Sequence, residues 1–265
     1  MPASREVALV TGASSGLGNR FAHLLAQRGW DLIVTGRRID LLEELRRKIE
    51  QDYAVSVQVI SHDLSEANSA RQLFDRIQES GDQVHVLVNN AGVGHYGQSL
   101  DQPLQSIAGM VNVNVVATTE LTRLFGERMK ATGGGYILQN ASFSGFVALP
   151  RYSIYAATKA YIVSLGLAMR YELRKSGVSI TVLCPGFAAT DFFDAAGHKM
   201  TGLMRLICMD PQMIAEAGID GLFRKRSLIV PGTIYKFCAL LLRVLPRYTA
   251  TAFAAAIVKD RAGRA

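Results

Sequence analysis

A tyrosine and a lysine four residues apart stand out in the stretch YSIYAATKAY, residues 152–161. On a helix, Tyr155 and Lys159 share one face and can meet. A phenol with a pKa near about 10 is a poor acid or base at neutral pH, and a nearby ammonium group lowers that pKa. The pair could then exchange a proton with a substrate, although the same spacing is also that of an ordinary surface pair. Tyr152 and Tyr161 do not share its register, so we assign them no chemistry.

A glycine-rich stretch, VTGASSGLG, follows the first apolar run and contains Gly12, Gly16 and Gly18. Glycines allow tight turns and close backbone approach, so the amino end of a following helix can hold a pyrophosphate. A plain loop is the alternative. The position between a predicted strand and a predicted helix favours a dinucleotide site.

Two arginines follow the second predicted strand, in VTGRRID. Dinucleotide folds that prefer NAD carry an acidic residue there for the ribose 2′-hydroxyl. Here Gly36 takes that place, and Arg37 and Arg38 come next. A guanidinium pairs with a 2′-phosphate, which a carboxylate would repel. The sequence therefore predicts NADP, with Arg37 as the preferred contact; two solvated arginines opening a helix are the alternative.

The elements that must position these residues alternate along the chain. Short apolar, β-branched runs predict seven strands, at residues 7–11, 31–35, 56–60, 84–89, 135–139, 179–183 and 227–230. Amphipathic stretches predict helices between them, at about 17–28, 38–51, 66–79, 101–130, 152–176 and 211–224. This alternation predicts an α/β fold: a doubly wound (Rossmann) seven-stranded parallel sheet with helices on both faces, in a single domain over residues 1–265.

Taken together, the motifs resemble the short-chain dehydrogenase/reductase family, in its single-domain NADP-preferring type. The glycine stretch has the family's spacing T-G-x3-G-x-G, and further matches follow in the right order over about residues 5–195. They are NNAG at 89–92, Asn114 in the fourth helix, Ser142 after the fifth strand, Tyr155 with Lys159, and PG at 185–186.

The resemblance implies four catalytic residues. Tyr155 would donate a proton to a carbonyl oxygen as hydride arrives, and Ser142 would hydrogen-bond the same oxygen. Lys159 would hold the phenol's pKa down and bind the nicotinamide ribose. Asn114 would hold a water that links Lys159 to solvent; Asn112 competes for that role, but Asn114 fits the family's distance to Ser142 better.

For the cofactor, the resemblance implies a binding set spread over six loops. Asp63 matches an adenine-contacting acid, although a helix N-cap is an equally physical role for it. Thr190 matches a contact to the nicotinamide carboxamide. The full set is Gly12, Ser14, Gly16, Leu17, Gly18, Arg37, Arg38, Asp63, Leu64, Asn90, Ala91, Gly92, Tyr155, Lys159, Pro185, Gly186 and Thr190.

The longest irregular stretch, residues 186–210, follows the sixth predicted strand. Its length and place predict a substrate lid. Apolar side chains dominate it, which favours a lipophilic substrate over a plain core closure; they are Phe187, Phe192, Phe193, Met200, Leu203, Met204 and Leu206. Phe143, Phe146 and Leu149 are the other predicted pocket wall, and His95 and Tyr96 lie on a loop that touches substrate or solvent.

The C-terminal segment, residues 233–265, is predicted to be a basic amphipathic extension. From Arg224 to the end there are nine Lys and Arg against the single acid Asp260, so this part carries +8 of the formal net charge of +7 and the rest carries −1. Pro246 interrupts its apolar runs, which are too short to span a membrane. Three alternatives remain open for it: an anionic membrane surface, a partner subunit, or a cover for the end of the sheet.

Composition narrows the remaining classes. Three widely spaced cysteines predict no disulfide framework, five histidines show no metal-ligand spacing, and no motif supports nucleic-acid binding. No targeting stretch precedes the first strand, so a cytoplasmic protein is expected, peripheral to a membrane at most. The resemblance implies a homodimer or homotetramer, paired through the helices at about 101–130 and 152–176.

These inferences predict an NADP(H)-dependent oxidoreductase, of the carbonyl reductase or alcohol dehydrogenase type. It would interconvert a carbonyl and an alcohol on a lipophilic small molecule. The alternative is a non-catalytic module that binds NADP(H) and senses redox state. Ser142, Tyr155 and Lys159 argue against that alternative, because a sensor needs no proton donor.

Overall fold

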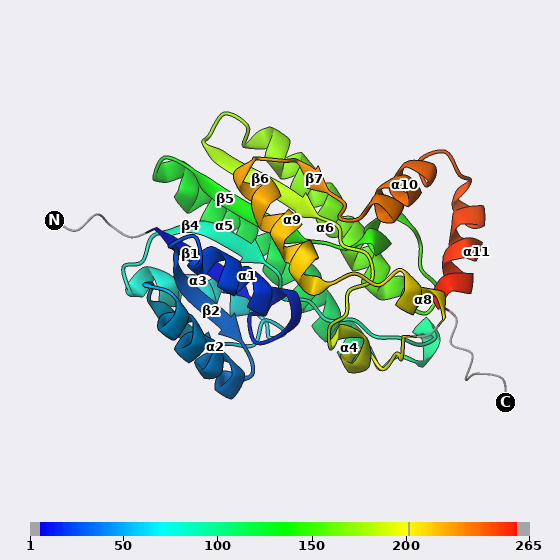
Figure 1. The fold of residues 1–265 in the computed structure, drawn as a ribbon, viewed down its shortest axis with the longest axis horizontal. Coiled ribbons are helices and arrows are strands. Elements are labelled where there is room, and N and C mark those ends of the chain that lie inside the picture. Colours follow the sequence, from blue (N-terminus) through cyan, green and yellow to red (C-terminus); the bar gives the residue numbers. More distant parts are fainter. Residues whose placement is uncertain (1–5, 201, 259–265) are drawn as a thin grey trace.

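The computed structural model describes residues 6–200 and 202–258 (Figure 1). Within these residues, seven parallel strands form one sheet in the order β3-β2-β1-β4-β5-β6-β7, which confirms the doubly wound fold. The strands are β1 (Val7–Thr11), β2 (Asp31–Gly36), β3 (Val57–Ser61), β4 (Val84–Asn89), β5 (Gly135–Asn140), β6 (Val178–Leu183) and β7 (Leu228–Ile229). The central strands are buried on both faces, as parallel strands between helix layers must be.

Two helix layers cover the sheet. One face packs against α1 (Gly16–Ala26), α2 (Ile39–Asp52) and α9 (Pro211–Phe223). The other packs against α3 (Ser69–Glu79), α5 (Thr118–Ala131) and α6 (Ser153–Glu172). Because β1 lies between β2 and β4, the chain winds away from β1 in both directions. In such sheets a crevice forms at the carboxyl ends of the two central strands, where ligands bind.

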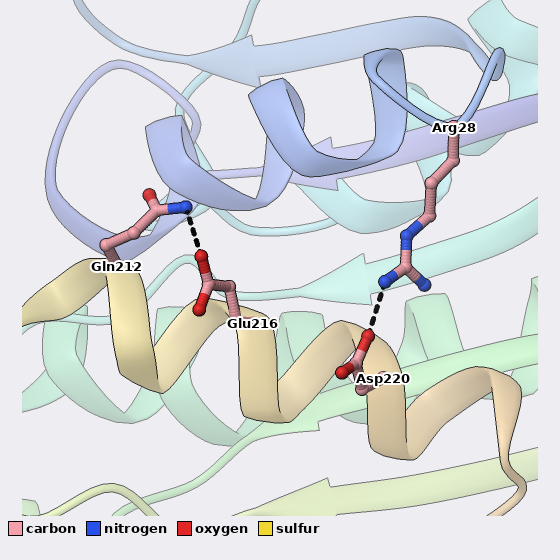
Figure 2. Close-up of polar contacts among 4 residues, drawn as sticks. All are labelled: Arg28, Gln212, Glu216 and Asp220. Atoms are coloured by element: carbon pink, nitrogen blue, oxygen red, sulfur yellow. Dashed lines mark hydrogen bonds and ion pairs between the residues drawn. The ribbon is translucent and has the colours of Figure 1, made fainter.

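Apolar packing rather than ion pairing joins α9 to α1. A Cβ atom on Gly218 of α9 would lie 3.2 Å from the ring of Phe21 in α1. Figure 2 shows the polar contacts nearby: Arg28 pairs with Asp220, and Gln212 donates a hydrogen bond of 2.9 Å to Glu216. These side chains reach solvent, where such pairs contribute roughly 0–1 kcal/mol each.

The predicted long helix at 101–130 is three segments. A 3₁₀ turn (Ser99–Asp101) precedes α4 (Leu104–Val111), and a π-helical turn (Asn112–Ala117) separates α4 from α5. The Thr118 side chain donates to the carbonyl of Val113, five residues back. A π turn adds a residue to the helical register, so it changes which side chains face the sheet.

The irregular stretch at 186–210 contains two short helices, α7 (Phe192–Ala195) and α8 (Leu203–Leu206). Its two ends are joined by a parallel bridge between Ala188 and Met209. The amide of Met209 donates to the carbonyl of Phe187 at 2.8 Å. The segment is therefore a closed loop on the sheet's carboxyl end.

Two further helices follow β7: α10 (Thr233–Leu241) and α11 (Arg247–Val258). Figure 1 shows them, in orange and red, at one end of the molecule beside α8. Ala254 and Val258 of α11 pack into a cluster with Leu149, Tyr152 and Phe193. In the part of the chain that the structure describes, no helix is long and apolar enough to cross a membrane. Residues 259–265 of the predicted extension lie outside the described residues.

Candidate active site

Ser142, Tyr155 and Lys159 meet at the carboxyl end of the sheet. Ser142 follows β5 and caps a 3₁₀ turn (Phe143–Phe146), with its Oγ accepting a hydrogen bond of 3.2 Å from the Ser144 amide. Its side chain is also hydrogen-bonded to the hydroxyl of Tyr155. The Nζ of Lys159 lies 5.7 Å from the centre of the Tyr155 ring, so the two side chains share a face of α6 as their spacing predicts.

Burial sets the pKa of both partners in α6. It raises the pKa of Tyr155 to about 12, against the hydrogen bond from Ser142, and lowers that of Lys159 to about 8, against Cys184. The predicted lowering of the phenol's pKa by the lysine is wrong for the protein groups alone, because desolvation disfavours both charged forms. Tyr155 is consequently a protonated phenol at neutral pH.

Lys159 is held by a residue that the sequence interpretation missed. Its ammonium donates a hydrogen bond of 2.8 Å to the carbonyl of Asn140, the last residue of β5. The Asn140 side chain donates in turn to the Asn90 side chain at 2.9 Å. A polar residue ending the apolar strand GYILQN was the available signal.

The π turn brings Asn114 toward the same lysine. A Cβ atom on Gly92 would lie 3.3 Å from Nζ of Lys159 and 3.5 Å from Oδ1 of Asn114, so the two polar ends converge there. Asn114 donates to the Val93 carbonyl and to Thr158, and it accepts from the Val93 amide. One acceptor position of Oδ1 has no protein partner among these bonds, which is what holding a water requires.

Asn112 faces elsewhere. Its side chain donates a hydrogen bond of 2.9 Å to the Ser65 carbonyl, on the loop after β3. The structure thus brings Asn114, and not its competitor, to Lys159.

The glycine-rich loop has the geometry of a phosphate cradle. Gly12 and Gly16 have φ angles of +64° and +56°, which side chains disfavour. A Cβ atom on Gly18 would lie 2.1 Å from the Gly12 carbonyl oxygen, so α1 can start this close to the strand only with glycine there. Asn90 fastens the loop by donating to the carbonyls of Thr11 and Gly12 at 2.9 and 3.2 Å.

Of the two arginines after β2, Arg38 lies on this loop. Its guanidinium donates to the hydroxyls of Ser14, at 3.2 Å, and Ser15, at 2.6 Å. Arg37 lies toward Asp63, whose carboxylate it influences electrostatically. The sequence preferred Arg37 for the phosphate contact, but the geometry favours Arg38.

Asp63 caps a turn rather than a helix. Its Oδ1 accepts from the Ser65 amide at 2.9 Å, whereas α3 begins later, with Asn68 as its N-cap. Burial would raise the pKa of Asp63, but the hydrogen bonds from Ser65 and the charge of Arg37 outweigh it and lower that pKa. The alternative of Asp63 as an N-cap is therefore wrong.

One cavity of about 730 Å³ joins the loop, Ser142, Tyr155 and Lys159. All but two of the predicted catalytic and cofactor residues line it; the two that do not are Gly18, beneath the loop, and Asn114, behind Lys159. Thr190 lies against the loop, since a Cβ atom on Gly16 would be 3.5 Å from its side chain.

Apolar side chains form the far part of the cavity, and only some were predicted. Those that line it as expected are Phe143, Leu149, Phe187, Phe192 and Phe193. Phe146 instead packs on Phe143, and Leu206 is exposed. Met200 and Met204 pack in the cluster under α11, so these four assignments to the pocket wall are wrong. The side chain of Leu203 lies outside the described residues.

The C-terminal helices complete the cavity, which the sequence did not indicate. Tyr235 of α10 lies so close over Gly186 that a Cβ atom there would be 2.0 Å from its ring. Its hydroxyl accepts from the Phe187 amide and donates to the Ile207 carbonyl, both at 3.0 Å. One side chain thereby ties α10 to both ends of the 186–210 segment.

Tyr96 and Tyr152 support the wall from behind. The Tyr96 ring stacks on His198 at 3.8 Å, and its hydroxyl donates to the Val258 carbonyl of α11. The Tyr152 hydroxyl lies 3.0 Å from Nδ1 of His198. Tyr152 lines the cavity, while Tyr96 and His95 do not.

Comparison with known proteins agrees with this geometry. The sequence profile of the family described as short chain dehydrogenase matches residues 6–201. An uncharacterized oxidoreductase of Staphylococcus saprophyticus is 30% identical over 217 residues, which cover 82% of this chain and 91% of that protein. The very-long-chain 3-oxoacyl-CoA reductase-A of Danio rerio is 30% identical over 189 residues, 69% of this chain and 58% of that protein. A solved short-chain dehydrogenase from Sphingobium yanoikuyae, in complex with NADPH, has a TM-score of 0.81 and 27% identity, covering 91% of this chain and 97% of that one.

A doubly wound parallel sheet with a glycine loop at its switch point defines a dinucleotide-binding class of fold. The matching profile spans most of the chain, from strand β1 to the segment after β6. This chain belongs to the short-chain dehydrogenase/reductase family, and it is an oxidoreductase of that family.

Proposed function

We propose that this protein is an NADP(H)-dependent oxidoreductase that interconverts a carbonyl and an alcohol on a lipophilic substrate. The observation that carries the proposal is the meeting of Ser142, Tyr155 and Lys159 in one cavity with the glycine loop. The Sphingobium relative contains NADPH, and the Danio relative is a reductase of a long-chain 3-oxoacyl compound, which supports both parts.

The loop and its neighbours fit a dinucleotide phosphate. Gly12 and Gly16 adopt left-handed backbone, and the helix that follows offers its amino end to a pyrophosphate. Arg38 is held beside the loop by Ser14 and Ser15, where it would pair with a 2′-phosphate. Gly36 leaves no carboxylate to repel that group.

A bound NADPH supplies the hydride for the reduction. Tyr155, protonated at neutral pH, donates its proton to the carbonyl oxygen, which becomes the alcohol oxygen. Ser142, hydrogen-bonded to the same phenol, stabilises the charge that develops on that oxygen. Lys159, with a pKa of about 8, stays largely charged and favours the phenolate that remains. Asn114 holds the water through which a proton returns.

The 186–210 segment acts as the lid. Three of its phenylalanines line the cavity, and the bridge between Ala188 and Met209 gives it fixed ends. Closing such a segment over the substrate excludes water from the site of proton transfer.

A panel of carbonyl and alcohol compounds, assayed with NADPH and NADH, tests the proposal on the wild type and on Tyr155→Phe. We expect turnover with NADPH, and a loss of about 10²–10⁴-fold in kcat in the variant, the usual contribution of a positioned acid. Tight NADPH binding without turnover on any compound would instead favour the redox-sensing module.

A further inference from the structure

The outer side of the two C-terminal helices presents large apolar side chains to solvent. We call this set the outer apolar face; it consists of Phe237, Leu240, Leu241, Val244, Tyr248 and Phe253. Phe237 is 67% exposed and Tyr248 is 87% exposed. The members from Phe237 to Val244 recur at helical spacing, so they form a stripe rather than scattered residues. A stripe of this kind marks an interaction surface.

The charges around the outer apolar face are all positive. Lys236, Arg243 and Arg247 are exposed between its members. The sequence has no Asp or Glu between Asp220 and Asp260. A surface that combines apolar side chains with basic ones and lacks acids is complementary to an anionic lipid layer.

A second copy of the chain fits this surface less well. A two-fold interface places the same patch on both subunits. It would bring Lys236, Arg243 and Arg247 of both copies into one interface, with no acidic partner from either helix. The charge pattern therefore favours lipid over self-association.

The cavity reaches this surface. Ile234 of α10 is 57% exposed and also lines the cavity, which places it at the rim. Cys238, Ala254 and Ile257 line the cavity from the inner sides of the same two helices. The helices thus separate the cavity from the outer apolar face by one helix thickness, and Figure 1 shows both at the same end of the molecule.

We propose that the outer apolar face and Lys236, Arg243 and Arg247 dock this protein on an anionic lipid bilayer. Docking brings the rim at Ile234 to the membrane surface. A lipophilic carbonyl compound dissolved in the bilayer then enters the cavity without crossing bulk water. This entry step rests on the proposed function, whereas the docking itself does not.

Sedimentation of the full-length protein with vesicles tests the docking. One set of vesicles is phosphatidylcholine alone and the other contains phosphatidylglycerol. We expect binding to the second set only, weakened at high salt because surface charges are screened. Reversing three charges in Lys236→Glu/Arg243→Glu/Arg247→Glu should weaken binding roughly 100-fold. Phe237→Ser/Leu240→Ser/Val244→Ser should also reduce binding at least about tenfold.

A matched control reverses three exposed charges elsewhere, in Arg47→Glu/Lys130→Glu/Lys175→Glu. This control should bind vesicles like the wild type, and all variants should keep wild-type affinity for NADPH, which shows that they are folded. Equal binding by the first variant and the control would overturn the proposal. So would a wild type that ignores both vesicle types while the serine variant turns a dimer into a monomer. Neither outcome depends on turnover, so failure of the proposed reaction would be seen separately.

Discussion

At the residue scale, exclusion of water decides the chemistry of the tyrosine and lysine pair. Tyr155 and Lys159 are close, yet the pKa of each moves away from its charged form because burial disfavours both charges. A phenol with a raised pKa holds its proton until a substrate oxygen becomes basic enough to take it. This arrangement suits reduction, in which the tyrosine must enter the reaction protonated.

The desolvated lysine should make the protein less stable than it would be without that charge. The pKa of Lys159 is about 8 in the folded protein and 10.5 as its ordinary value, so between these pH values the unfolded chain binds more protons. Its contribution to the free energy of unfolding therefore rises from pH 8 to pH 10.5 and is at its minimum below pH 8. We expect Lys159→Met to unfold at higher urea concentration at about pH 7, by up to about 3 kcal/mol, while losing activity.

The matched control for this prediction is Lys130→Met, at an exposed position of α5. It should change stability by less than about 0.5 kcal/mol at either pH. The gain in Lys159→Met should shrink between about pH 8 and about pH 10. A gain of the same size at neutral and at alkaline pH would mean that Lys159 is not desolvated.

The choice between NADP and NAD should depend on Arg38 more than on Arg37. Only Arg38 is fixed on the phosphate loop, by Ser14 and Ser15. Losing a charged hydrogen-bond partner costs about 1.5–3 kcal/mol, so Arg38→Ala should raise KM for NADPH about 10–100-fold and leave KM for NADH nearly unchanged. Arg37→Ala is the control, and steady-state kinetics with both cofactors is the measurement. A larger effect in Arg37→Ala would return the phosphate contact to that residue.

At the element scale, the fold was predictable where local periodicity decides it. Each strand lies within one or two residues of its prediction, because β-branched runs between two helix layers leave little choice. The π turn (Asn112–Ala117) was not predictable, since it keeps helical spacing almost unchanged while shifting one side chain. Asn114 was found only through the family resemblance. Tyr235 was missed because its role depends on contacts with Gly186 and Phe187, about fifty residues away in sequence.

The π turn should matter for both stability and turnover. Asn114→Ala leaves the amide and carbonyl of Val93 and the hydroxyl of Thr158 without their partner. At about 1–3 kcal/mol for each buried unsatisfied group, partly relieved by water, we expect a net loss of about 2–3 kcal/mol in urea unfolding and a lower kcat. Asn112→Ala removes one bond to Ser65 and should cost about 1 kcal/mol with kcat unchanged. Equal kcat in the two variants would remove Asn114 from the proposed proton path.

At the scale of the whole molecule, one body and one extension share the cavity. The sheet and its helices provide the glycine loop, Ser142, Tyr155 and Lys159, which together make the cofactor half. The lid and the C-terminal helices provide the apolar half, and Tyr235 joins them. Cofactor binding and substrate size should therefore be separable by substitution.

Filling the apolar half from α11 tests that separation. Ala254 is buried and lines the cavity, so the larger ring in Ala254→Phe occupies space meant for substrate. We expect KM for long-chain carbonyl compounds to rise at least about tenfold, because each methylene group that an apolar pocket can no longer accommodate is worth about 1–3 kcal/mol. Short compounds and NADPH should bind as in the wild type, since Arg38 and the glycine loop lie at the other end of the cavity. Ala256→Phe, on the exposed side of α11, is the control and should leave every constant unchanged. If Ala254→Phe raised KM equally for short and long compounds, the C-terminal helices would not set substrate size.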